Sequence, residues 1–107
     1  MSKIEVNKGI ITQINVFKVK PENMQALIDL LIEAAEAVKD TPGWISANFH
    51  RSLDGTQLVN YAQCESYESW EAVMKKLVEG NFLKRNKELA EANPGLYEVI
   101  YTVEKDN

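Results

Sequence analysis

Residues 44–64 read WISANFHRSLDGTQLVNYAQC, and this stretch decides the fold. Two runs rich in β-branched and aromatic residues, Trp44–Leu53 and Thr56–Cys64, flank the dipeptide Asp54-Gly55. Asp-Gly between two such runs is a strong signal for a β-hairpin, because a tight two-residue turn needs positive φ at both of its residues. The sequence therefore predicts two antiparallel strands joined by a two-residue loop.

A two-residue loop also fixes which residues lie opposite one another, because pairing is counted outward from the turn. In this register Phe49 opposes Asn60, and Ile45 opposes Cys64. One face of the hairpin then carries Ile45, Ala47, Phe49, Arg51, Leu58, Asn60, Ala62 and Cys64. The other face carries Trp44, Ser46, Asn48, His50, Val59, Tyr61 and Gln63. Neither set is polar enough for a solvated face, so both faces need a cover.

The elements on either side of the hairpin follow from hydrophobic spacing. A run rich in β-branched residues predicts a strand upstream, and apolar residues at helical spacing predict a helix after Pro21. Downstream, Ser66 can cap a second helix that Gly80 interrupts. The expected elements outside the hairpin are a strand at Ile10–Lys20, a helix from Met24 that ends at Thr41-Pro42-Gly43, a helix after Ser66, a third short helix at Phe82–Ala92 that ends at Asn93-Pro94-Gly95, and a last strand at Leu96–Val103.

The order β-α-β-β-α-(α)-β indicates an α+β, ferredoxin-like fold, in which helices cover one face of a four-stranded antiparallel sheet. We expect a single domain over residues 1–107, with its core at about 9–104. The face without helices would carry Trp44, Ile14, Val16, Val59 and Tyr61, joined by Tyr97, Val99 and Tyr101 of the last strand. A second identical subunit is the simplest cover for such a face. The sequence therefore predicts a homodimer packed sheet on sheet.

Composition excludes several classes of protein. The 107 residues carry 12 Lys+Arg and 16 Asp+Glu, a net charge of −4, which argues against a nucleic-acid partner. One cysteine makes no internal disulfide, and one cysteine with one histidine cannot build a structural zinc site. The first residues lack the apolar region of a signal peptide, and no apolar stretch reaches membrane-spanning length. We therefore expect a cytoplasmic protein without a membrane partner.

Three stretches resemble the antibiotic biosynthesis monooxygenase (ABM) domain family. They are TPGWISANFHRSLDG at 41–55, VNYAQ at 59–63 and INVFKVKPE at 14–22, within a similarity that covers roughly residues 9–77. The resemblance implies a dimeric α+β barrel of ferredoxin-like subunits. It also implies chemistry, since the better understood members oxygenate polycyclic phenols, anthrones or dihydroquinones without metal or flavin.

Cofactor-free oxygenation needs no redox-active group from the protein, because the deprotonated substrate itself supplies electrons to O₂. The protein must offer a dry apolar pocket, a route for the proton and hydrogen-bond donors for the anion. The resemblance thus predicts a cofactor-independent monooxygenase acting on a small aromatic or quinol-type substrate.

The resemblance also assigns site residues. Asn60 matches the pocket asparagine of the NYAQ motif and would hold the substrate oxygen, and Trp70 stands where many members have a tyrosine. Cys64 replaces the motif tryptophan, and Lys84 or Arg85 lies in the region of a basic residue that helps in some members. The expected catalytic residues are Asn60 and Trp70, and the expected substrate-binding residues are Asn15, Phe17, Phe49, Cys64 and Arg85.

Other interpretations of the same residues stay open. Cys64 reads as a small buried hydrophobic residue, and His50 as a structural residue on the dimer side. Because the motif tryptophan is missing, a non-catalytic module that binds small hydrophobic molecules is the alternative function. A haem-degrading protein is a third, for which Asn15 would match but Cys64 replaces a tryptophan and no histidine follows it.

Overall fold

The computed structural model describes residues 4–6 and 9–106 and confirms the predicted α+β, ferredoxin-like architecture. Its elements are β1 (Ile11–Val19), the 3₁₀ turn η1 (Pro21–Asn23), α1 (Met24–Val38), β2 (Trp44–Arg51), β3 (Gln57–Cys64), α2 (Tyr67–Glu79), α3 (Phe82–Leu89) and β4 (Ala90–Tyr97). The four strands form one sheet in the order β2-β3-β1-β4, and every neighbouring pair is antiparallel.

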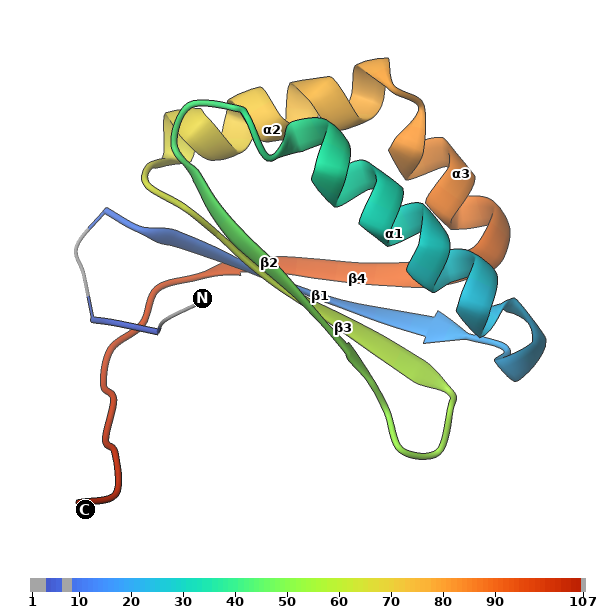
Figure 1. Ribbon diagram of the computed structural model, residues 1–107, viewed down its shortest axis with the longest axis horizontal. Helices are drawn as coiled ribbons and strands as arrows, with labels where there is room; N and C mark the ends of the chain where they lie inside the picture. Colours follow the sequence, from blue (N-terminus) through green and yellow to red (C-terminus); the bar gives the residue numbers. More distant parts are fainter. Residues whose placement is uncertain (1–3, 7–8, 107) are drawn as a thin grey trace.

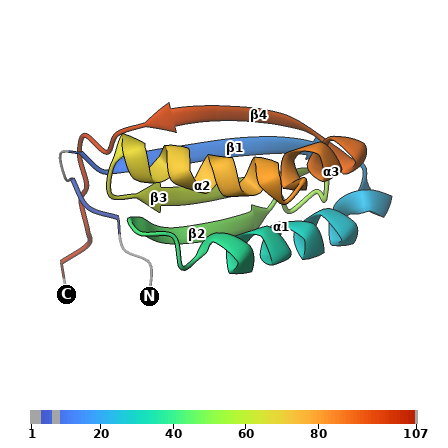
Figure 2. The ribbon, with the colours of Figure 1, turned by 90° about the horizontal axis from the view of Figure 1, so that it is seen from above.

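All three helices lie on one face of this sheet (Figure 1). Seen from above, α1 and α2 run side by side over the strands, with α3 following α2 toward the start of β4 (Figure 2). The main core lies between sheet and helices, where Phe17, Leu27 and Leu58 are at most 1% exposed. No helix among the described elements covers the opposite face, which we call the open face.

The hairpin has the predicted register near its turn and departs from it at the far end. Phe49 pairs with Asn60 as expected. A β-bulge then lets Trp44 pair with Cys64 and leaves Ile45 without a partner in the ladder. The predicted Ile45–Cys64 pair is therefore wrong, and so is the expected place of Trp44 on the open face. The extra residue reverses the alternation, so that Trp44 joins the helix-side cluster of Val38 and Cys64.

The turn also differs from the expected two-residue loop. Strand β2 ends at Arg51 and β3 begins at Gln57, and within the loop between them only Gly55 has positive φ (76°). The Asp54 carboxylate accepts hydrogen bonds from Ser52 Oγ (2.8 Å), Thr56 Oγ1 (2.7 Å) and the Thr56 amide (3.0 Å). These bonds, led by the Thr56 hydroxyl, hold the pKa of Asp54 below its ordinary value. Side-chain bonds thus stabilise a wider loop where a tight turn was expected.

The C-terminal elements lie earlier than the sequence predicted. Helix α3 ends at Leu89, and β4 occupies Ala90–Tyr97, so the expected helix to Ala92 and strand at Leu96–Val103 are wrong. Pro94, which the sequence predicts to end a helix, lies inside β4, an edge strand where a missing amide hydrogen is tolerated. Residues 98–106 carry no helix or strand and extend away from the sheet (Figure 1).

The turn from α1 into β2 needs glycine at position 43. Gly43 has φ +88°, and a β-carbon there would lie 1.9 Å from Ser69 Oγ in the first turn of α2. Ser66 caps that helix as predicted, since its Oγ accepts from the Ser69 amide at 3.1 Å. The α1–β2 turn therefore packs directly against the start of α2.

No helix within the described ranges is both long enough and apolar enough to cross a lipid bilayer.

Candidate ligand site

A cavity of about 320 Å³ lies between the sheet and the helices. Its floor comes from the helix-facing side chains of the four strands, which are Gln13, Asn15, Phe17, Trp44, Ala47, Phe49, Asn60, Ala62, Ala92 and Pro94. Its roof comes from the three helices through Leu31, Ala34, Ala35, Val38, Val73, Met74, Leu77, Phe82, Leu83, Asn86 and Lys87. The lining is mostly apolar with a few carboxamides, and the volume falls in the range of small-molecule sites.

The floor places two predicted asparagines side by side. Asn15 on β1 and Asn60 on β3 are direct partners in the ladder. Asn15 already has a structural bond, because its Oδ1 accepts from the Asn93 amide at 3.1 Å. The buried Oδ1 of Asn60, in contrast, has no hydrogen-bond partner among the described residues. A buried carbonyl without a partner is costly, so Asn60 has an unused capacity to bind a ligand oxygen or hydroxyl.

Four of the seven predicted site residues line the cavity: Asn15, Phe17, Phe49 and Asn60. Phe17 on β1 and Phe49 on β2 supply flat apolar surface to the lining. Trp70, Cys64 and Arg85 are not among the lining residues. The structure therefore brings four strand residues of the predicted site together in the cavity floor. Cys64, at the end of β3, and the two helix residues lie outside the lining.

Cys64 and Trp70 lie together behind one end of the cavity. Cys64 is 4% exposed and packs with Val38 and Val73, while Trp70 packs against this cluster. Burial raises the pKa of the Cys64 thiol, which disfavours a reactive thiolate. The Trp70 indole stacks at a tilt on Tyr67, with ring centroids 5.3 Å apart, and its buried Nε1 has no partner among the described residues.

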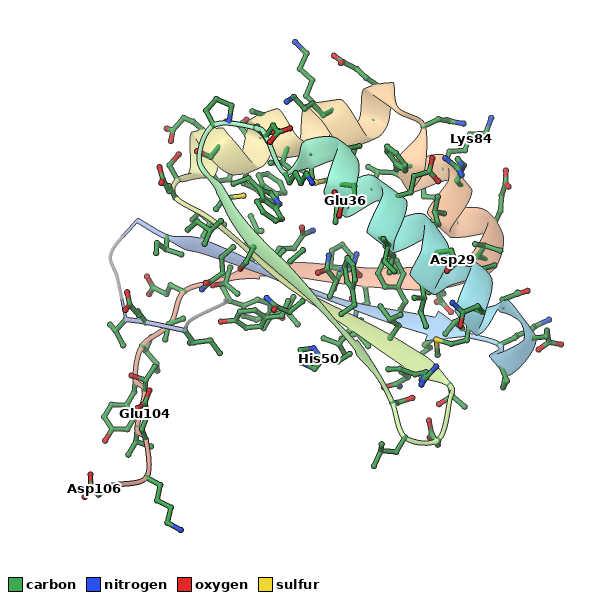
Figure 3. All side chains as sticks on the ribbon, viewed as in Figure 1. Asp29, Glu36, His50, Lys84, Glu104 and Asp106 are labelled. Atoms are coloured by element: carbon green, nitrogen blue, oxygen red, sulfur yellow. The ribbon has the colours of Figure 1, made fainter. Side chains whose placement is uncertain are left out.

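Arg85 faces away from the cavity. Its guanidinium pairs with Glu33 on α1 (Nη2 to Oε2, 3.1 Å) and lies 5.6 Å from the centre of the Phe82 ring. Lys84, the other predicted basic residue, points to the outside of α3 (Figure 3). The interactions of Arg85 connect α3 to α1 on the outer surface. A different basic residue lines the cavity.

That basic residue is Lys87, which sequence reasoning missed together with Trp44 and Asn86. A signal for the helix residues was present, because positions 86 and 87 follow the apolar Phe82 and Leu83 by four residues and so share their face. No such signal existed for Trp44, since only the bulge brings it to the helix side.

The site offers little to a metal ion or to haem. The described residues contain no group of three or more His, Cys, Asp or Glu side chains that could hold a metal. The one histidine of the sequence, His50, lies on the open face, away from the helices (Figure 3). Haem ligation by a histidine of this chain inside the cavity is thus excluded by position.

Comparisons with known proteins agree with this geometry. The family model for antibiotic biosynthesis monooxygenases matches residues 10–76. Tetracenomycin-F1 monooxygenase from Streptomyces glaucescens is 40% identical over 74 residues, which is 68% of this chain and 66%, just under two thirds, of that enzyme.

Solved structures show the same fold. The monooxygenase from the gene ActVA-Orf6 of Streptomyces coelicolor, in complex with nanaomycin D, superposes with a TM-score of 0.77 at 23% identity, over 90% of this chain and 92% of that one. SnoaB, a cofactor-independent oxygenase from Streptomyces nogalater, has a TM-score of 0.77 at 17% identity, over 91% and 99% of the two chains. The match of sequence motif, topology and family model shows that this chain belongs to the antibiotic biosynthesis monooxygenase family.

Proposed function

We propose that this protein is a cofactor-independent monooxygenase that acts on a small aromatic, phenol- or quinol-type molecule held between sheet and helices. The observation that carries the proposal is the apolar cavity of about 320 Å³ with the unpaired Oδ1 of Asn60 in its floor. The monooxygenase activity of the 40% identical relative supports it.

The chemistry follows from what the lining can provide. Loss of a proton turns an anthrone or a dihydroquinone into an electron-rich anion that can reduce O₂ without a flavin or a metal. Asn60 can hydrogen-bond the oxygen on which negative charge develops, and Lys87, an exposed residue that contributes to the cavity lining, can supply positive charge nearby. For anthrone, one O₂ converts the CH₂ group to a carbonyl and releases one H₂O, so no external reductant is needed.

Oxygen uptake with anthrone and 1,4-dihydroxynaphthalene tests the proposal. We expect catalysed uptake above the buffer rate, with one O₂ consumed per anthrone, and a loss of roughly 100-fold in Asn60→Ala because a hydrogen bond to the developing anion is removed. Gln25→Ala is the control, since Gln25 is exposed on α1 and bonds only to Asp29. An Asn60→Ala enzyme as fast as wild type contradicts the role of Asn60.

Two placements favour the non-catalytic alternative, a module that binds small hydrophobic molecules. Cys64 occupies the position of the motif tryptophan, and Trp70 does not line the cavity. This alternative predicts saturable binding of the same compounds, with the ligand recovered unchanged and no O₂ consumed. The oxygen measurement therefore separates the two functions.

We propose further that the protein is a homodimer in which the open faces of two subunits meet. Apolar residues of the open face, among them Val16, Val59 and Tyr61, are partly exposed, and no helix of the described chain covers them. Ile100, Tyr101 and Val103 of the C-terminal segment are also 73–82% exposed. A second copy would bury both sets of side chains, and a twofold arrangement does so with one surface.

A further inference from the structure

The helix side of the cavity contains a buried polar residue that the proposed chemistry does not use. Asn86 lies on the same face of α3 as Phe82 and Leu83 and lines the cavity. It is only 8% exposed, and its Oδ1 has no hydrogen-bond partner among the described residues. Asparagine is a weak helix former, so local propensity does not explain its place here.

Two other asparagines, one in the cavity lining and one in η1, show what a structural role looks like. The Oδ1 of Asn15 accepts from the Asn93 amide at 3.1 Å and joins β1 to β4. Asn23 Nδ2 donates to the Leu89 carbonyl at 3.4 Å and joins η1 to the end of α3. The Oδ1 of Asn86 makes no such bond to the described residues. Because Asn86 lines the cavity, this oxygen has an unused capacity to bind a molecule there.

Asn86 and Asn60 approach the cavity from opposite sides. Asn60 belongs to the sheet floor and Asn86 to the helix roof, and both have a buried Oδ1 without a partner. Rotation of a carboxamide about its last torsion exchanges oxygen and nitrogen at low cost, so each group can present a donor or an acceptor. Besides Gln13, Asn15 and Lys87, the mostly apolar lining thus has two carboxamides with an unpaired oxygen, one on the sheet side and one on the helix side.

We propose that Asn86 is a specificity-determining residue that hydrogen-bonds a second oxygen substituent of the ligand, opposite the oxygen held by Asn60. The inference rests on the proposed function and narrows its substrate class to aromatic molecules with oxygen substituents on opposite edges of the ring system. A compound with a single hydroxyl group would satisfy one carboxamide and leave the other unpaired.

Two probes that differ in one oxygen test this inference. The affinities of 1,4-dihydroxynaphthalene and 1-naphthol are measured by titration calorimetry without O₂, so that neither compound is oxidised. We expect wild type to prefer the dihydroxy compound by about tenfold, as one additional hydrogen bond to a buried group would give. In Asn86→Leu, which has similar volume, we expect this preference to fall to about twofold or less, while the affinity for 1-naphthol changes little.

Stability separates a binding role from a structural one. If Asn86 serves the ligand, Asn86→Leu and the smaller Asn86→Ala both fold, and the urea midpoint of Asn86→Leu is equal to or above that of wild type. Gln25→Leu, the same type of change on the exposed side of α1, should keep the tenfold preference.

Three other outcomes would contradict either the role of Asn86 or the ligand site itself. A preference unchanged in both Asn86 variants overturns the role of Asn86 and leaves the proposed function in place. Failure of both variants to fold also overturns it, because it would show that Asn86 is structural. If wild type binds neither probe, the ligand site of the proposed function fails as well.

Discussion

At the scale of single residues, hydrogen bonding divides the three asparagines of the cavity into two kinds. Asn15 is committed to the backbone of β4, whereas Asn60 and Asn86 keep a buried oxygen unpaired. Evolution of a fold for stability alone would pair or replace such groups. Both unpaired oxygens belong to residues that line one cavity, where a ligand can offset their cost.

Cys64 gives a prediction about reactivity. The thiol is 4% exposed, and burial raises its pKa, so both access and thiolate formation are reduced in the folded protein. We expect iodoacetamide at pH 7.5 to alkylate Cys64 roughly 100-fold or more slowly in the native protein than in 8 M urea. Mass spectrometry reads this directly because the sequence has one cysteine. Equal rates in both states would contradict the buried, unreactive thiol.

At the scale of elements, the turn between α1 and β2 sets how the helices lie on the sheet. Gly43 combines φ +88° with close contact to Ser69, whereas Gly55 has φ +76° and nothing within 4 Å of an added β-carbon. We expect Gly55→Ala to lower the free energy of unfolding by about 1 kcal/mol, from backbone strain alone. Gly43→Ala should cost about 3 kcal/mol or more, because α2 must also move away.

Urea unfolding followed by circular dichroism measures both glycine variants. The matched pair isolates the steric contact, since each variant adds the same methyl group at positive φ. Equal losses of stability would show that the turn does not fix the position of α2.

The sequence predicted elements well where local chemistry alone decides them. Ser66 was identified as a cap, and the order of strands and helices followed from periodicity. Prediction from the sequence failed where pairing between strands distant in the sequence determines the structure. Pro94 is compatible with β4 only because that strand is an edge, and Trp44 reaches the helix side only through a bulge. The same limit applied to the site, because the strand residues Asn60 and Phe49 were placed by register, but Lys87 and Asn86 needed the position of α3 over the sheet.

At the scale of the whole molecule, the open face provides a test of assembly. We expect size-exclusion chromatography with light scattering to give the mass of two chains for wild type and of one chain for Val16→Glu, because a carboxylate would be buried without a partner between the sheets. Ala26→Glu is the control, since Ala26 is exposed on α1 on the other side of the molecule. A monomeric wild type, or a dimeric Val16→Glu, would contradict the proposed interface.

The bulge at Ile45 makes the shape of the cavity depend on how β2 pairs with β3 as well as on the residues that β2 contains. Removing Ile45 would give an uninterrupted ladder in which Trp44 still lies opposite Cys64, so the indole would stay in the cavity floor. If Ile45 itself paired with Cys64, the Trp44 indole would instead turn to the open face, and the smaller Ile45 side chain would leave more space for a ligand. The one residue that the ladder omits thus couples the size of the ligand space to the surface available for assembly.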